Sequence, residues 1–179
     1  MANKTVLELL STASHDLRTK SANFISSADV ENGQLFAQDV LSTDADKSEV
    51  YTVAQPATAN LSGLFMAYAP EDLIVVLADG TKYKLDNMNP QNFVNVAGYV
   101  FSGFQPAIGD KIKITAEGFT GAIGGNTFAV GADGQDKLVW AGSAGGGLSF
   151  ILEATSYISI AKAFGSQRTV AYQLRCVKN

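Results

Sequence analysis

The pattern of apolar and polar residues predicts a β-hairpin within residues 73–85. Two runs rich in β-branched and aliphatic residues flank Asp79-Gly80. This pair suits a two-residue type I′ turn, because both central positions of such a turn need positive φ. Pairing across the turn would place Val76 opposite Tyr83. The hairpin indicates that the chain builds its fold from short antiparallel strands.

Similar runs recur to the C-terminus and are separated by turn residues, mostly Pro, Gly, Asp and Asn. The expected strands are residues 50–54, 64–68, 73–78, 81–85, 94–101, 111–117, 127–130, 137–141, 148–153, 157–161 and 169–177. One helical turn is expected at residues 89–93, where Pro90 suits the first helical position. Many short strands at close spacing predict an all-β domain, either an antiparallel β-barrel or a two-sheet β-sandwich.

Two of these strands show which side chains they bury. Ile112 and Ile114 alternate with Lys111 and Lys113, the pattern of a strand with one buried and one solvated face. Cys176, the only cysteine, lies on the apolar face of the last predicted strand. A single cysteine excludes an intramolecular disulfide framework. A thiol on an apolar face is expected to be buried and inert.

Residues 1–48 differ from the rest of the chain. Ser, Thr, Ala and Asn are frequent there, between short apolar runs such as Val6–Leu10, Leu35-Phe36 and Val40-Leu41. The first of these runs suits a short strand or one helical turn. Since the apolar residues are too few for a separate core, we predict an extended N-terminal arm holding one or two strands, followed by the β-domain of residues 49–179. Deleting the arm is expected to leave that domain folded.

Composition and charge narrow the classes of partner. Charged residues make up 17% of the chain, against a usual share of about 25%. That share fits a β-protein covered in part by partners, and it also fits a monomer with a surface rich in Ser, Thr, Asn and Gln. The net charge of −4 argues against nucleic acid as a partner. Acids concentrate in residues 29–86 and none follows Glu153, which suits either a head-to-tail assembly or an uneven solvated surface.

Neither secretion nor membrane insertion is predicted. The N-terminus has no charged region followed by an apolar stretch, as a secretion signal would. No run approaches the roughly 20 apolar residues that a membrane-spanning helix requires. We therefore expect no membrane partner.

The sequence contains no catalytic or metal-binding constellation. His15, the only histidine, stands beside Asp16 in a stretch rich in Ser and Thr. We expect His15 to be a solvated polar residue and not a member of a catalytic triad. One histidine and one cysteine cannot supply the three or four ligands that zinc requires. We expect no enzyme activity, no cofactor and no metal.

Two loop patterns have ordinary structural readings. The glycine runs at residues 121–125 and 142–147 lack the Lys-Ser/Thr of a phosphate-binding loop, and neither opens a helix. They are expected to be hairpin loops and bulges. The acidic turn at residues 133–136 lacks the ligand spacing and the terminal Glu of an EF-hand, which leaves only weak calcium binding open.

Two patterns bear on carbohydrate chemistry. Strands could bring Glu71, Glu117 or Glu153 together as the paired carboxylates of a glycosidase, although nothing in the sequence favours it. Trp140 is the one aromatic residue suited to anchor a sugar, but its apolar neighbours indicate a place in the core.

Several stretches carry a family resemblance. They are residues 62–68 (SGLFMAY), 92–101 (NFVNVAGYVF), 106–112 (PAIGDKI), 138–140 (LVW) and 157–160 (YISI), followed by 167–168 (QR) and 171–172 (AY). Together they resemble the small auxiliary, or decoration, proteins that tailed bacteriophages encode beside their major capsid protein. The likeness covers roughly residues 50–179 and contains no active-site motif.

The resemblance implies a β-barrel or β-sandwich on the outside of a phage capsid, without enzyme activity. The implied partners are the major capsid protein and further copies of the chain, with a trimer as the first choice of homo-oligomer. The implied location is the capsid surface of the virion, after synthesis in the host cytoplasm. The alternative is a fibre-like or glycan-binding β module on a virion or cell surface. An enzyme with carboxylate chemistry is a third class.

Overall fold

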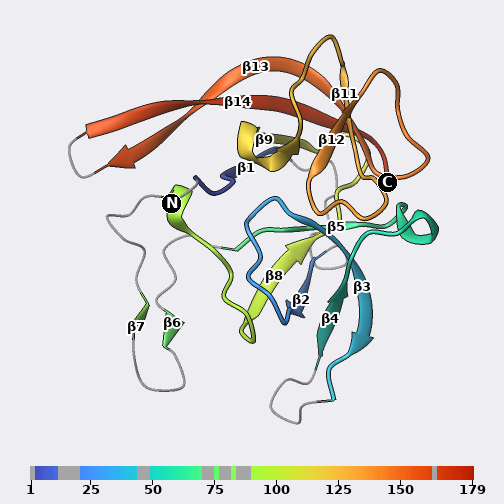
Figure 1. Cartoon of the computed structure of the whole chain (residues 1–179), viewed down its shortest axis with the longest axis vertical. Coiled ribbons are helices and arrows are strands. Elements are labelled where there is room, and N and C mark those ends of the chain that lie inside the picture. Colours follow the sequence, from blue (N-terminus) through green and yellow to red (C-terminus); the bar gives the residue numbers. More distant parts are fainter. Residues whose placement is uncertain are drawn as a thin grey trace.

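The computed structural model describes residues 3–11, 21–43, 49–69, 75–76, 82–83, 90–162 and 165–179. The fold is all-β, as the sequence predicts. A seven-stranded sheet, at the top of Figure 1, lies over a closed five-stranded barrel, and a separate two-stranded hairpin stands beside them. The predicted barrel is therefore present, combined with an open sheet.

The elements have the following bounds. The barrel has the order β2 (Ser21–Ile25), β4 (Val50–Ala54), β3 (Leu35–Leu41), β5 (Phe65–Ala67) and β8 (Val100–Phe104). The sheet has the order β1 (Leu7–Ser11), β9 (Lys111–Thr115), β14 (Gly165–Lys178), β13 (Ser149–Lys162), β11 (Phe128–Val130), β12 (Leu138–Ala141) and β10 (Phe119–Thr120). The small hairpin is β6 (Val75–Val76) with β7 (Lys82–Tyr83), and the 3₁₀ turns are η2 (Thr58–Asn60), η4 (Pro90–Asn92) and η5 (Ala116–Gly118).

Aromatic rings fill the inside of the barrel. The ring of Phe24 on β2 lies 4.7 Å from that of Phe36 and 5.0 Å from that of Phe65, measured between centroids. Phe101 on β8 completes the group, with its centroid 5.7 Å from that of Phe36. Gly103 makes room for them, because a Cβ there would lie 2.7 Å from the Phe36 ring. The rings pack against one another and form the core of the barrel.

The main core lies between the barrel and the sheet. Barrel strands alternate, so that Phe36 points into the barrel while Leu35 and Met66 point into the main core. Ile112 and Ile114 of β9 enter the same core and are both fully buried, as their alternation with lysines predicts. Both faces of these barrel strands are thus covered, which ties the two sheets into one folding unit.

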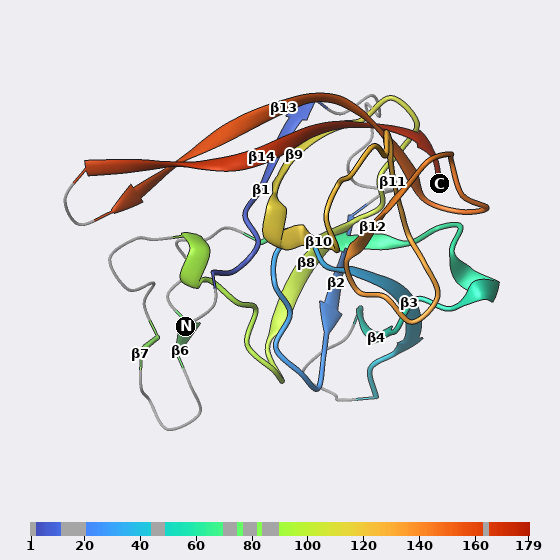
Figure 2. The same cartoon turned by 45° about the horizontal axis from the view of Figure 1, so that its top comes forward.

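The hairpin of β13 and β14 extends past the rest of the sheet, as Figures 1 and 2 show from two directions. Its strands pair from Ser149↔Lys178 to Lys162↔Gly165. One face of the distal part packs Ile158 and Ile160 against Val6 in a small separate core. The opposite face of this distal part of the hairpin lies beyond the end of the main core.

The residues expected to form an arm are part of this core. Strand β1 pairs with β9, while β2 and β3 are barrel strands. Phe24 and Leu35 are 0% and 2% exposed. The division at residue 48 therefore does not separate an arm from a domain, because strand pairing across it supplies the burial that the first 48 residues lack alone.

The register of the small hairpin differs from the expected one. Val76 lies opposite Lys82 and Val75 opposite Tyr83, whereas a two-residue turn would have placed Val76 opposite Tyr83. The shift is one residue, which changes the pairing of every position. The turn pair Asp79-Gly80 lies outside the described residues.

Three other expectations need adjustment. Residues 148–153 and 157–161, expected as two strands, belong to the single strand β13. The glycine runs at 121–125 and 142–147 open no helix, yet neither is a hairpin loop. The first connects β10 to β11, which lie on opposite sides of β12, and the second connects β12 to β13 across β11. Adjacency in sequence does not fix adjacency in the sheet.

Candidate functional site

Of the three carboxylates considered for a glycosidase pair, the structure describes Glu117 and Glu153, which lie at opposite ends of β9. Glu153 on β13 forms an ion pair with Lys111, at the start of β9. Glu117 lies in η5, beyond the other end of that strand. Its Oε2 atom is buried without a hydrogen-bond partner among the described residues. Glu71 and His15 lie outside the described residues.

The two other candidate residues are in the core. Cys176 is 0% exposed, which agrees with the expectation of a buried thiol. Trp140 is 8% exposed and stacks on Phe119, so its indole is not available as a platform for a sugar ring. Both positions were assigned to the core by their apolar neighbours in sequence.

The acidic turn at residues 133–136 serves to attach the β11–β12 connection to the barrel side. Asp133 accepts a hydrogen bond from the backbone N–H of Thr58 at 2.7 Å, and Asp136 accepts one from the Gln34 amide at 2.6 Å. Within the described ranges, no three His, Cys, Asp or Glu side chains form a group that could hold a metal ion.

A polar network around Glu31 joins three segments of the chain. Its carboxylate lies 3.0 Å from Lys4 Nζ and 3.7 Å from Lys137 Nζ, and it accepts hydrogen bonds from the backbone N–H and hydroxyl of Thr5. Partial burial alone would raise the pKa of Glu31, but Lys4, Thr5 and Lys137 together hold it below its usual value. The network is a structural clamp between the start of β1, the start of β3 and the start of β12.

A second polar cluster lies on the face of the seven-stranded sheet away from the main core. The carboxylate of Glu153 forms ion pairs with Lys111 and Arg175, each at 2.9 Å. It also accepts a hydrogen bond from the side-chain amide of Gln173 at 3.1 Å. Lys111, followed by Gln173 and Arg175, lowers the pKa of Glu153. With three partners, this carboxylate belongs to a structural network of ion pairs and hydrogen bonds.

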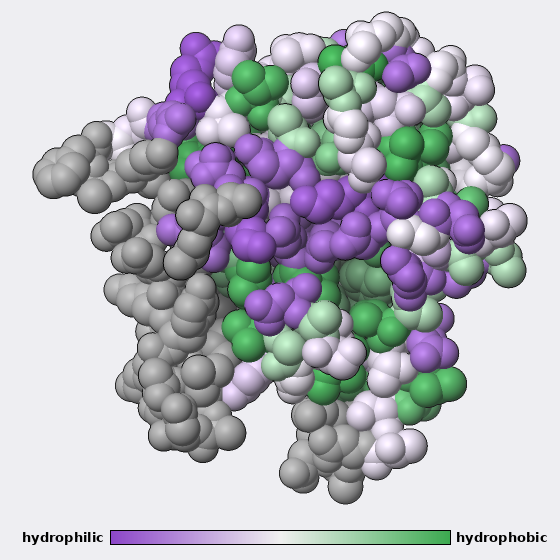
Figure 3. Space-filling view, in the orientation of Figure 1, coloured by the Kyte–Doolittle hydropathy of each residue, from purple (hydrophilic) through white to green (hydrophobic). Residues whose placement is uncertain are grey.

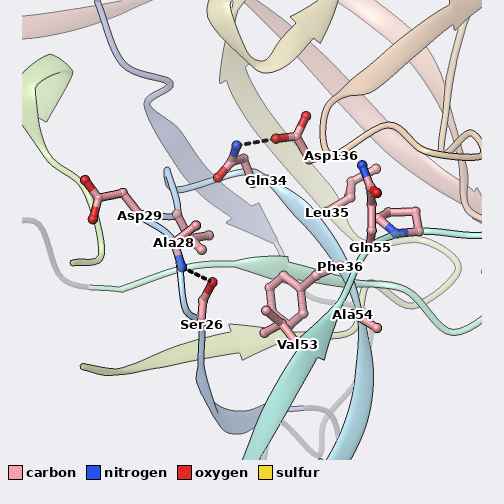
Figure 4. A pocket seen from close by; sticks show the side chains of 12 residues that line it. Ser26, Ala28, Asp29, Gln34, Leu35, Phe36, Val53, Ala54, Gln55 and Asp136 are labelled. Carbon is pink, nitrogen blue, oxygen red and sulfur yellow. Dashed lines mark hydrogen bonds between the residues drawn. The ribbon is translucent and has the colours of Figure 1, made fainter. Parts of the chain in front are cut away.

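A shallow pocket of about 230 Å³ opens between the β3–β4 side of the barrel and the β11–β12 connection. Figure 4 shows Phe36 and Val53 on one side of the pocket, with Gln34, Gln55 and Asp136 at the opposite rim. Most of these polar groups already have partners: Gln34 donates to Asp136, and Gln55 donates to the backbone carbonyl of Gly134 at 2.9 Å. The pocket offers apolar contact with a polar rim, and it holds no nucleophile with an adjacent base.

Exposed apolar side chains mark other surfaces. Ile108, Val40 and Leu41 are 66%, 64% and 53% exposed. Val40 and Leu41 are the last two residues of β3, where the register with β4 shifts between Gln38 and Leu41. Figure 3 shows one face of the molecule, where hydrophobic surface lies on both sides of a hydrophilic band.

The β3 end is held in place by hydrogen bonds from the neighbouring strand. The Thr52 hydroxyl lies 3.1 Å from the carbonyl oxygen of Val40 and 3.3 Å from the carboxylate of Asp39. The side chains of Val40 and Leu41 are therefore presented on an ordered strand. The sequence shows Val40 and Leu41 as an apolar pair, and from that pattern alone both side chains would be expected to be buried.

The distal β13–β14 hairpin presents a second exposed surface. Tyr157 lies opposite Val170, and the two side chains are 47% and 41% exposed. The guanidinium of Arg168 lies 4.4 Å from the centre of the Tyr157 ring, a cation–π contact. The apolar run that contains Val170 was expected on a buried face. Tyr172, Leu174 and Cys176 reach the main core from that face, but Val170 lies beyond its end.

None of the helical turns in the described residues is long and apolar enough to cross a membrane. Comparison of the chain with protein-family models, with curated proteins and with solved structures found no match.

Proposed function

We propose that this chain is a structural virion protein that binds the outside of a tailed-phage capsid and stabilises or decorates it. The sequence resemblance over residues 50–179 supports this class. The structural observation that carries the proposal is the exposed, ordered apolar pair Val40-Leu41 at the end of β3. Exposed apolar surface on an otherwise well-packed β-protein is typical of a protein contact.

The capsid contact is proposed at this barrel end and not at an N-terminal arm. Residues 3–11 and 21–43 contain the strands β1, β2 and β3, which pair with strands of the sheet and the barrel, so these segments are anchored in the fold and do not extend as an arm over another subunit. Full burial of one Val or Leu side chain contributes about 1.5–3 kcal/mol. Because Val40 and Leu41 are 64% and 53% exposed, burying the rest of both side chains contributes roughly 2–3 kcal/mol, one part of the about 8 kcal/mol of a micromolar contact.

The partners under this proposal are the major capsid protein and further copies of the chain, without nucleic acid or membrane. A trimer is the oligomer that the resemblance favours. The chain would have no enzyme activity, and its place would be the capsid surface of the virion.

Under this proposal the test uses empty shells assembled from the major capsid protein of the same phage. Wild-type protein is expected to co-sediment with the shells, and the Val40→Ser/Leu41→Ser double variant to bind at least about tenfold more weakly. Ile108→Ser is the matched control, because Ile108 is equally exposed but lies in the turn between β8 and β9. Absence of wild-type binding, or equal loss in both variants, would refute the proposed contact.

A fibre-like or glycan-binding module is the second candidate, and the pocket in Figure 4 is the observation in its favour. Amide and carboxylate groups above an apolar floor suit a ligand with hydroxyl groups. If this candidate is right, the protein binds immobilised glycans, and Gln34→Ala removes the binding while Val40→Ser/Leu41→Ser retains it. Buried Trp140 is not available to assist.

A further inference from the structure

The free edge of β13 contains a long stretch without charged residues, residues 154–161, between Glu153 and Lys162. Strand β11 pairs with β13 only over Ser149–Ile151, with one further hydrogen bond from Leu152 N–H to the Thr127 carbonyl. From Glu153 onward, β13 has no neighbour on that side among the described residues. The backbone N–H and C=O groups that point to this side need partners, which water or another strand must supply.

The sequence of this edge lacks the features that normally prevent edge pairing. Residues 154–161 read Ala-Thr-Ser-Tyr-Ile-Ser-Ile-Ala, without a charged residue, a proline or a glycine. Natural edge strands are usually short, bulged or charged, because an open edge pairs readily with another chain. Uncharged segments of high β-propensity are those that pair most readily.

The distal hairpin also gains from a further strand. From Tyr157↔Val170 to Lys162↔Gly165 it has only its own two strands, since β9 pairs with β14 only over Ala171–Arg175. Two-stranded ribbons are marginally stable in water, and a third or fourth strand stabilises them. Burial of Ile158 and Ile160 against Val6 supports one face only.

We propose that β13 pairs antiparallel with β13 of a second copy, across a twofold axis at Tyr157, which places Thr155 of each copy opposite Ser159 of the other. The two hairpins then form one four-stranded sheet in the order β14, β13, partner β13, partner β14. Antiparallel pairing of identical strands satisfies twofold symmetry and closes on itself, so the product is a dimer and not a filament.

Charge favours this edge over the other one. The β14 edge carries Arg168, and pairing of two β14 strands would bring two such cations together. Pairing through β13 leaves them on the outer strands, three strand spacings or about 14 Å apart. That distance exceeds the Debye length of about 8 Å at physiological salt. The same pairing aligns the exposed faces of Tyr157 and Val170 into one continuous apolar strip.

The first test measures the oligomeric state of the isolated protein by sedimentation velocity. Wild-type protein is expected to be a dimer. Thr155→Lys/Ser159→Lys, at two exposed positions on β13, is expected to raise the dimer dissociation constant about tenfold, because like charges face each other across the new pair. Ser166→Lys/Gln167→Lys adds the same charge at exposed positions on β14 and is expected to leave the dimer intact.

The second test locates the interface with spin labels. With the axis at Tyr157, the Cα atoms of residue 159 in the two copies lie about 14 Å apart and those of residue 166, which is opposite Ala161 on β13, about 31 Å apart. Labelled Ser159→Cys should therefore show strong dipolar broadening, and labelled Ser166→Cys should not. Cys176 is buried and does not compete for label.

Several results would overturn the proposal: a monomer at the highest attainable concentration, a trimer, or equal weakening by both lysine pairs. Broadening at residue 166 in place of 159 would do the same. A dimer would take the place of the trimer that the resemblance favours. These measurements involve no capsid, so they do not decide whether the chain binds one, and the co-sedimentation test remains separate.

Discussion

The ring of Phe119 lies flat against the indole of Trp140, with centroids 4.4 Å apart and planes 9° from parallel. Phe119 begins β10 and Trp140 lies in β12, so the stack joins two strands that pair in parallel. The ring of Tyr172 on β14 meets both edge-on, at 5.3 Å and 5.0 Å. Aromatic contacts thus tie β14 to the neighbouring strands β12 and β10, from which β13 and β11 separate it in the sheet.

Replacing the indole should therefore destabilise the whole fold. Trp140→Ala is expected to lower the free energy of unfolding by about 3–5 kcal/mol, and Trp140→Phe by less, since a ring remains to stack on Phe119. Urea unfolding should be followed by circular dichroism, because Trp140 is the only tryptophan. Ile108→Ala, at a side chain 66% exposed, should change stability by no more than about 0.5 kcal/mol. Equal effects of the two alanine variants would contradict the core position of Trp140.

Gly147 lies close to the backbone of Leu61, whereas the adjacent Gly146 has open space around it. A Cβ at Gly147 would overlap the backbone carbonyl of Leu61, whereas a Cβ at Gly146 would meet nothing within 4 Å. The Leu61 carbonyl also accepts a hydrogen bond from the Leu148 N–H at 2.8 Å, so this approach joins the start of β13 to the barrel side.

We expect Gly147→Ala to cost about 1–3 kcal/mol or more, because backbone must move to relieve the overlap. Gly146→Ala is the matched control and should lie within about 0.5 kcal/mol of wild type. The unfolding temperatures of the two variants, measured in parallel, test this expectation. If they unfold at the same temperature, the close approach of Gly147 to Leu61 is not formed in solution.

Local patterns predicted those strands that have one buried and one solvated face. Strand β4 has the expected bounds, residues 50–54. The alternation of Ile112 and Ile114 with lysines correctly assigned the faces of β9, and Cys176 is buried as expected. In these strands a period of two is visible in the sequence because one side of each strand faces water.

Non-local pairing was beyond the reach of the same patterns. The stretch around Phe24 is rich in Ser and Asn, yet Phe24 is fully buried because β2 pairs with β4 and β8 to close the barrel. Closure depends on partners 27 and more residues away, and no local pattern records it. The exposure of Val40 and Leu41 could not be predicted either. An apolar pair indicates burial unless the end of its strand is known to lie outside the core.

Glu31 gives the fold a defined response to acid. Its pKa is lowered in the folded state, so the carboxylate stabilises the fold above its unfolded pKa, and this contribution is lost as pH falls through the folded value. Glu31→Gln should cost about 1–3 kcal/mol at pH 7, and the cost should shrink as the pH falls below 4.5, the usual value for Glu. Urea unfolding at a series of pH values measures this difference. A cost that stays constant into acid would show that the charge of Glu31 contributes nothing.

The N-terminal third of the chain provides the sharpest test of the fold. Deleting residues 1–48 removes β1, β2 and β3 together, which opens the barrel and exposes the main core at Leu35. The remaining residues should therefore fail to fold, contrary to what the composition of this segment suggests. Circular dichroism and solubility of the truncated protein report the outcome.

Because a truncation can fail for unrelated reasons, point variants in β2 complete the test. Phe24→Ala removes a side chain that is 0% exposed and contacts four other aromatic rings in the barrel, and it should cost about 3–5 kcal/mol. Asn23→Ala, at the exposed neighbouring position, should cost less than about 0.5 kcal/mol. If Phe24→Ala is as stable as Asn23→Ala, or if the truncated chain folds, then β2 and β3 do not belong to the barrel, and the first 48 residues are an appendage after all.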